Sequence, residues 1–139
     1  MKKVNTVLLI DDNDADNEYH ELVISGTGRA NRLNSVTDSR DALKCWKENC
    51  SEPALNAIPD LVFLDINMPA INGFELLDRI KQTPDPNGLK SKMKIFMLTT
   101  SQNPEDHHRA TNQYADMIMG FYTKPLTTKV FEKIVEDHF

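Results

Sequence analysis

Short apolar runs alternate along this chain with longer stretches in which apolar residues recur at helical spacing. Short runs favour buried strands, whereas apolar positions three and four residues apart favour helices with one buried face. The expected strands are residues 6–10, 33–36, 61–64, 95–98 and 117–122, and the expected helices are 14–27, one after 38, one after 73, 104–114 and one from 127. This alternation predicts an α/β fold with an open, doubly wound parallel sheet of five strands.

Three elements carry more detailed signals. The run at 61–64 is almost wholly apolar, which is typical of a central parallel strand covered on both faces. Asp38 stands where an N-cap is expected, because its carboxylate can accept hydrogen bonds from free N–H groups of the helix that follows. In the helix at 14–27, four apolar residues are expected to face the sheet. These are Tyr19, Leu22, Val23 and Ile24.

Length and charge limit the possible classes of function. A chain of 139 residues suits a single domain, which we expect to cover residues 1–139. With 16 Lys and Arg against 21 Asp and Glu, the net charge is −5 at pH 7. Such a protein repels a phosphate backbone, so we expect no nucleic-acid partner. The apolar runs are far shorter than the roughly 20 residues that cross a bilayer, and the N-terminal residues lack the apolar core of a signal peptide. A cytoplasmic protein without a membrane partner is expected.

Polar residues follow the predicted strands at the edge where doubly wound sheets form ligand sites. Asp11 and Asp12 follow the first strand, Asp65 the third, Thr99 the fourth and Lys124 the fifth. Taken singly, each could be a turn former, a helix cap or a surface residue. Together they place three carboxylates at one edge, where they repel one another unless a cation lies among them. Ligands that are all oxygen favour Mg²⁺.

A cation, a lysine and a hydroxyl around one carboxylate are the groups needed to transfer a phosphoryl group to that carboxylate. The transition state of this transfer is loose, so catalysis rests on positioning and on neutralising charge at the equatorial oxygens. Asp65 is expected to be ionised at neutral pH and able to attack directly, while Mg²⁺, Lys124 and Thr99 could each contact one phosphoryl oxygen.

These residues resemble the receiver domain of two-component response regulators, the family that accepts phosphoryl groups from histidine kinases. Residues 8–13 are similar to its acidic first-strand motif, and 65–69 followed by 72–77 to its phosphoacceptor motif. Residues 97–99 and 124–126 are similar to its remaining two motifs, so that the resemblance covers essentially the whole chain. It implies a flavodoxin-like (βα)₅ fold with strand order 2-1-3-4-5.

The resemblance also implies the roles of the acidic residues. Asp65 would be the phosphoacceptor. Asp12, the Asp65 side chain and the backbone carbonyl of Asn67 would bind Mg²⁺, and Asp11 would help to hold the ion through water.

Thr99 would be the switch hydroxyl, and Lys124, followed by a cis peptide to Pro125, would pair with the phosphoryl group. The aromatic switch position is Phe121, where tyrosine is commoner in the family. Phenylalanine cannot make a phenolic hydrogen bond, so coupling to Thr99 would rest on packing. Thr100 replaces the usual small residue and is expected to crowd the entrance to the phosphoryl pocket.

We therefore expect a receiver without an output domain, which is not an enzyme. Its partners would be a histidine kinase or a histidine phosphotransfer protein and a downstream protein target, and it would be a monomer or a phosphorylation-dependent dimer. Modification of Asp65 would shift an existing conformational equilibrium.

Three alternatives remain open. A phosphohydrolase with an aspartyl nucleophile would need an acid/base two residues later, where Asn67 stands. A flavodoxin-like cofactor binder would need a phosphate-binding loop after the first strand, where residues 11–14 are mostly acidic. A constitutive interaction module would keep the fold and not depend on phosphorylation.

Overall fold

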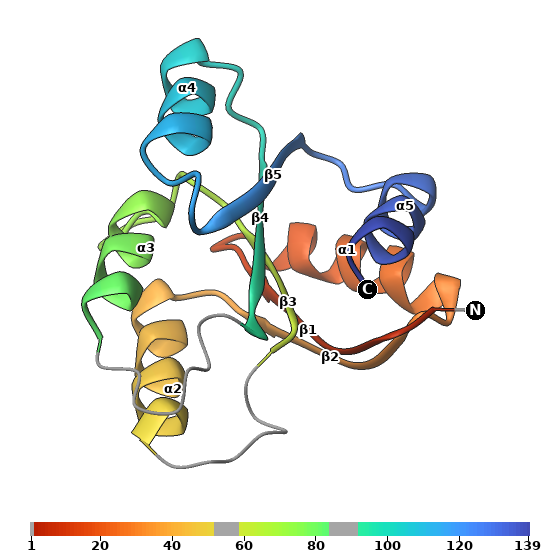
Figure 1. The fold of residues 1–139 in the computed structure, drawn as a ribbon. Helices are drawn as coiled ribbons and strands as arrows, with labels where there is room; N and C mark the ends of the chain where they lie inside the picture. The colour runs from red at the N-terminus through yellow and green to blue at the C-terminus, as the bar shows by residue number, and fades with distance from the viewer. Residues whose placement is uncertain (1, 52–58, 84–91) are drawn as a thin grey trace.

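The computed structural model describes residues 2–51, 59–83 and 92–139, and in it strands and helices alternate throughout (Figure 1). The strands are β1 (Val4–Ile10), β2 (Ala30–Val36), β3 (Leu61–Leu64), β4 (Lys94–Thr99) and β5 (Ile118–Thr123). The helices are α1 (Asp14–Thr27), α2 (Ser39–Ser51), α3 (Gly73–Gln82), α4 (Pro104–Asn112) and α5 (Thr128–His138).

All the strands pair in parallel, in the order β2-β1-β3-β4-β5, which confirms the predicted sheet and its topology. In the register, Ile10 lies beside Leu64, and Leu64 lies beside Met97. The carboxyl ends of the three central strands are therefore nearly level, and the residues that follow them meet at one edge of the sheet.

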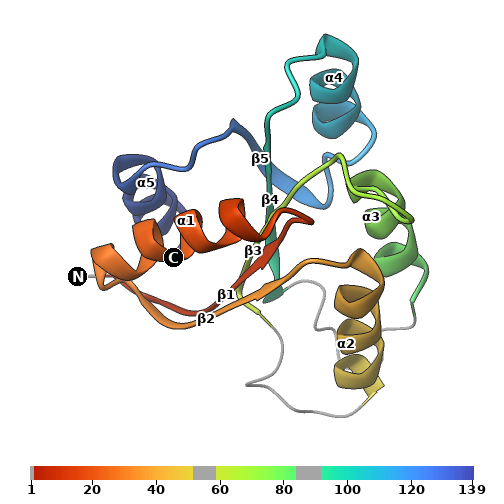
Figure 2. The ribbon, with the colours of Figure 1, turned by 180° about the vertical axis from the view of Figure 1, so that it is seen from behind.

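Helices cover the sheet on both faces, with α1 and α5 on one side and α2, α3 and α4 on the other (Figures 1 and 2). Two apolar cores result, one on each face. Phe63 packs with Phe96 and Phe131 in the core under α1 and α5, and Val62 and Leu64 belong to the opposite core. Because both faces of β3 are buried, all four of its residues can be apolar.

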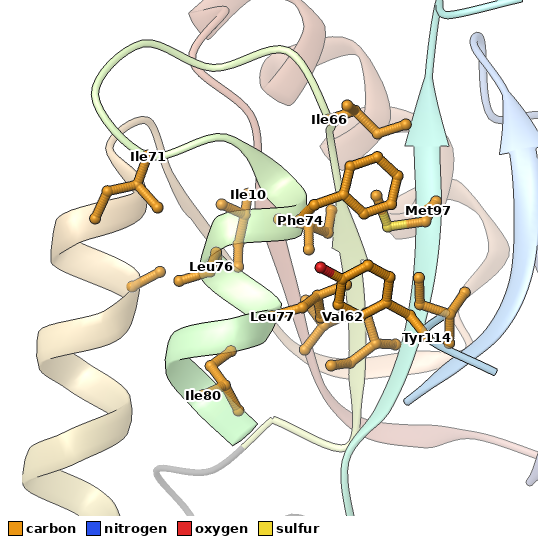
Figure 3. Packing of buried hydrophobic residues seen from close by; sticks show 14 of the residues in the cluster. Ile10, Val62, Ile66, Ile71, Phe74, Leu76, Leu77, Ile80, Met97 and Tyr114 are labelled. Atoms are coloured by element: carbon orange, nitrogen blue, oxygen red, sulfur yellow. The ribbon is translucent and has the colours of Figure 1, made fainter. Parts of the chain in front are cut away.

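The core under α3 positions the loop that follows β3. Figure 3 shows Phe74 and Leu77 of α3 directed toward the sheet, and the ring of Phe74 stacks on that of Tyr114 with centroids 5.3 Å apart. Ile80 of the same helix is also buried in this core. Asn72 caps α3 by accepting a hydrogen bond from the Glu75 N–H at 2.9 Å. These contacts hold the beginning of α3 against the end of β3.

The buried face of α1 differs from the prediction. Tyr19 and Leu22 are 51% and 69% exposed, and of the four predicted residues only Ile24 is fully buried. The other buried positions are Asn17 and His20. Hydrophobicity indicated the wrong face because α1 turns polar side chains toward the ends of the strands, where they find polar partners.

Several boundaries also differ by one to three residues, and two of them have a clear physical reason. β2 begins at Ala30 instead of residue 33, because an edge strand with exposed side chains keeps its backbone pairing to β1 without an apolar pattern. α4 ends at Asn112 rather than residue 114, since the chain turns there and places Tyr114 in the core. The predicted cap of α2 is confirmed, because the carboxylate of Asp38 accepts a hydrogen bond from the Arg40 N–H at 2.8 Å.

Candidate functional site

Strand pairing places Asp11 and Asp65 side by side. The pairing continues past the strand ends, because the Asp65 N–H donates to the carbonyl of Ile10 at 3.0 Å and the Asp11 N–H donates to that of Val36 at 3.2 Å. Asp11 and Asp65 are 5% and 6% exposed. Two carboxylates therefore lie buried at the edge of the sheet, where each requires polar partners.

Lys124 supplies a positive charge to both of them. Its N–H donates to the Thr99 carbonyl at 2.9 Å, and its peptide bond to Pro125 is cis, as predicted. Its ammonium forms a salt bridge with Asp11, and its Nζ lies 3.5 Å from an Asp65 oxygen. A third carboxylate, that of Asp16 in the first turn of α1, lies 2.8 Å from the same Nζ.

Asp12 completes a trio of carboxylates. Oxygen atoms of Asp11, Asp12 and Asp65 lie within 4.8 Å of one another, and Asp12 is exposed. This oxygen-only donor set, with two buried members and one that faces solvent, fits Mg²⁺, which retains several waters and binds one or two carboxylates directly. Asn67 is exposed two residues beyond Asp65, and its role as a carbonyl ligand stays a prediction.

Backbone contacts orient the two buried carboxylates. The Asn13 N–H donates to Asp11 Oδ1 at 3.0 Å, and the Ile66 N–H donates to Asp65 Oδ1 at 2.8 Å. Gly73 lies against the other side of Asp65, so closely that a Cβ there would stand 2.4 Å from the Asp65 carbonyl oxygen. Only glycine lets α3 approach the end of β3 to this distance.

The electrostatic environment raises the pKa of both Asp65 and Lys124, which disfavours the charged carboxylate but favours the charged ammonium. Burial raises the pKa of Asp65 above its ordinary 3.8, and the charge of Asp11 adds to this, whereas the Thr99 hydroxyl and the Lys124 charge oppose it. Burial alone would lower the pKa of Lys124. Hydrogen bonds to Asp11 and Asp16 and the charge of Asp65 outweigh burial and raise it, so this lysine is a cation at neutral pH.

The predicted switch residues lie along β4 and β5. Thr99 is fully buried, and its Oγ1 accepts a hydrogen bond from the Ser101 N–H at 3.2 Å. Phe121 is half-buried, and its ring packs on that of His107 in α4 with centroids 4.9 Å apart. Thr100 is exposed. The aromatic position therefore contacts α4, whereas Thr99 contributes to the electrostatics of Asp65.

Three polar residues of α1 contact the site that the strand ends form. Asp16 contacts Lys124, and the Asn17 side chain donates to the Asp11 carbonyl at 2.9 Å. His20 Nε2 accepts a hydrogen bond from the Leu126 N–H at 3.2 Å, two residues beyond Lys124. These contacts attach α1 to both loops that carry the charged residues.

A family model described as the response regulator receiver domain matches residues 7–136. The chain belongs to this family. Receiver domains bind Mg²⁺ in an acidic pocket and interact with histidine kinases and downstream effectors, and the Asp trio of this chain is a cluster of carboxylates that could hold a metal ion.

Individual response regulators are similar to this chain in sequence or in structure. The response regulator Rcp1 of Synechocystis sp. is 32% identical over 130 residues, which are 94% of this chain and 83% of Rcp1. The crystal structure of a two-component response regulator from Cytophaga hutchinsonii has a TM-score of 0.83 at 32% identity and covers 98% of this chain and 97% of that one. A receiver from Dyadobacter fermentans shares the fold, with a TM-score of 0.78 at 20% identity and 95% coverage of each chain.

The structure brings together Asp11, Asp12, Asp65 and Lys124 of this receiver, as the sequence predicted, but the contribution of α1 was missed. The spacing of Asn17, His20 and Ile24 by three and four residues was the available signal. It marks one helical face that begins polar near the strand ends and becomes apolar further along. Among the residues described, no helix is long and apolar enough to span a membrane.

Proposed function

We propose that this receiver accepts a phosphoryl group on Asp65 from a phosphohistidine of a histidine kinase or a histidine phosphotransfer protein, and signals through contacts with a downstream protein. The observation that carries the proposal is the position of Lys124 Nζ, 3.5 Å from Asp65 and in a salt bridge with Asp11, beside a trio of carboxylates within 4.8 Å. This arrangement places one cation, and two further carboxylates that can hold a metal ion, beside the buried carboxylate of Asp65.

In the proposed step, an oxygen of the Asp65 carboxylate attacks phosphorus and forms an O–P bond. The N–P bond of the phosphohistidine breaks, its electron pair stays on the imidazole nitrogen, and that nitrogen takes a proton from water. No separate base is required, because Asp65 is already an anion.

The other residues of the site would hold the metal ion and contact the phosphoryl group. Asp11, Asp12, Asp65 and the Asn67 carbonyl would hold Mg²⁺, which when bound neutralises charge on the phosphoryl oxygens. Lys124 supplies a second positive charge. The Thr99 hydroxyl would bind a phosphoryl oxygen, which is the role of the switch residue in receiver domains.

Two alternatives to this function predict different behaviour. A phosphohydrolase would turn over phosphate esters continuously, but Asn67 cannot act as the second acid/base. A constitutive module would bind its partner equally well with and without phosphodonor.

The protein is incubated with Mg²⁺ and acetyl phosphate, and its mass is followed by mass spectrometry. We expect one added phosphoryl group on the wild type, the same on Asp14→Asn, which removes an exposed carboxylate of α1, and none on Asp65→Asn. Equal modification of Asp65→Asn, or none of the wild type, would contradict the proposal. Size-exclusion chromatography with and without phosphodonor then separates a monomer from a phosphorylation-dependent dimer.

A further inference from the structure

Asp16 is the carboxylate at this site that neither the metal trio nor the phosphoacceptor accounts for. It lies in the first turn of α1 and is half-buried, and its Oδ2 is 2.8 Å from Lys124 Nζ. The Asp65 oxygen is farther from the same Nζ, at 3.5 Å. In the unmodified protein Lys124 therefore lies closer to α1 than to the residue that would be phosphorylated.

Lys124 does not need Asp16 in order to stay at the site. Its side chain is only 9% exposed, its N–H bonds to the Thr99 carbonyl, and its ammonium also pairs with Asp11. Removal of Asp16 would leave these contacts in place. Asp16 is thus not required to hold the ammonium in the pocket.

Asp16 is itself fixed. It belongs to the cap of α1, where its N–H donates to the Asn13 side chain at 3.1 Å. The lysine, by contrast, reaches the site on a long and flexible side chain. When charge changes at Asp65, the ammonium can shift toward it, whereas Asp16 stays on its helix.

We propose that Asp16 is a positioning residue that competes with the phosphoryl group for Lys124 and so weakens the modified state of the receiver. The inference rests on the proposed function, because the competitor is a phosphoryl group on Asp65. A phosphoryl group carries more negative charge than a carboxylate, so Lys124 transfers to it, and the loss of the contact with Asp16 opposes that transfer.

The first test measures affinity for beryllofluoride, a phosphoryl analogue that binds to a carboxylate oxygen, in the presence of Mg²⁺ by fluorine NMR. We expect Asp16→Asn to bind it about three- to fivefold more tightly than the wild type, which is the equilibrium effect of one partly exposed ion pair. Asp14→Asn is the matched control, because it removes the same charge from the same turn without a contact to Lys124 and should change the affinity less than about twofold. Asp16→Glu retains the charge and should remain close to the wild type.

The second test needs neither metal nor phosphoryl analogue. Lysine amines are labelled with limiting acetic anhydride, and the peptide that contains Lys124 is quantified by mass spectrometry against exposed Lys129 of the same molecule. With one carboxylate partner fewer, Lys124 should react about threefold faster in Asp16→Asn and at the wild-type rate in Asp14→Asn. A purely structural role of Asp16 in capping α1 would not produce this difference.

Equal beryllofluoride affinity in the Asp16→Asn and Asp14→Asn variants would overturn the inference, and so would weaker binding by Asp16→Asn, which would mean that Asp16 presents the lysine to the phosphoryl group. If Asp16→Asn fails to fold by circular dichroism, Asp16→Ser is measured in its place. If the wild type itself shows no binding that depends on Asp65, the proposed function fails. Faster labelling of Lys124 in Asp16→Asn would then still establish the Asp16 contact.

Discussion

The end of β3 and the first turns of α1 both deliver polar side chains to Lys124, but they do so by different means. Asp65 is the residue after an apolar strand whose pairing with β1 continues through its own N–H. Asp16 and His20 are parts of a helical face that is polar near the strand ends. At β3 the hydrophobic pattern predicts the position of the site residue correctly, whereas at α1 it predicts burial of a face that is largely exposed.

This difference has a physical cause. A strand places the residue after its last apolar position by backbone register, which is the same whatever side chains the neighbours carry. A helix places a residue by the face it turns to the sheet, and tertiary contacts choose that face. In α1, Asn17 and His20 are buried and hydrogen-bond to the neighbouring loops, whereas Tyr19 and Leu22 are exposed.

The largest expected effect is that of removing the cation on which both regions converge. Lys124→Met leaves Asp11 and Asp65 buried without it, so we expect the free energy of unfolding at pH 7 without divalent cations to fall by about 3 kcal/mol. Urea denaturation measures it. Lys129→Met, at an exposed position of α5, should change it by less than about 0.5 kcal/mol. Similar values for the two variants would mean that Lys124 does not stabilise the site.

The residues that sequence alone predicted are those placed by strand ends. Asp11, Asp65 and Thr99 each follow or end an apolar run, and the topology that the alternation implies brings such positions to one edge. β2 was predicted too short because its exposed side chains give no apolar pattern, although the strand spans seven residues and pairs with β1 from Ala30 to Val36.

The residues that sequence missed depend on contacts between elements. Nothing in the local pattern of α1 states that Asp16 faces a lysine 108 positions later, or that His20 faces the backbone of Leu126. The close approach of Gly73 to Asp65 is likewise a property of the packed fold. Such contacts follow from how α1 and α3 are seated on the sheet, and that is set by cores on both of its faces.

A pair of glycine variants tests how closely α3 packs against the end of β3. Gly73→Ala brings a Cβ to within 2.4 Å of the Asp65 carbonyl, so we expect a loss of about 2 kcal/mol in the free energy of unfolding and slower phosphorylation of Asp65. Gly26→Ala, in α1 with no atom near the added Cβ, should instead stabilise the protein by about 0.5 kcal/mol. Thermal unfolding and the rate of mass gain with acetyl phosphate measure the two effects. Losses of equal size would refute the close packing assigned to Gly73.

The smallest expected effect is on the pH dependence of the free energy of unfolding. Its sign differs between His20 of α1 and Asp65 after β3. Burial and the Lys124 charge lower the pKa of His20 below its ordinary 6.5, against the opposing charges of Asp16 and Asp11. Neutral His20 therefore contributes stability above pH 6.5 that is lost as the pH falls through its folded pKa. Asp65, whose pKa is raised above 3.8, contributes stability at low pH that is lost as the pH rises through its folded value.

Two variants separate these contributions, each compared with the wild type by urea denaturation at a series of pH values. Relative to His20→Gln, whose amide oxygen can still accept the Leu126 N–H, the wild type should lose stability as the pH is lowered from about 7.5 to 5. Relative to Asp65→Asn, the wild type should gain stability as the pH is lowered toward 3.8. A stability difference that stays constant with pH in either comparison would show that the residue's charge state is not coupled to folding. The polar face of α1 would then be joined to the loop after β5 through hydrogen bonding alone.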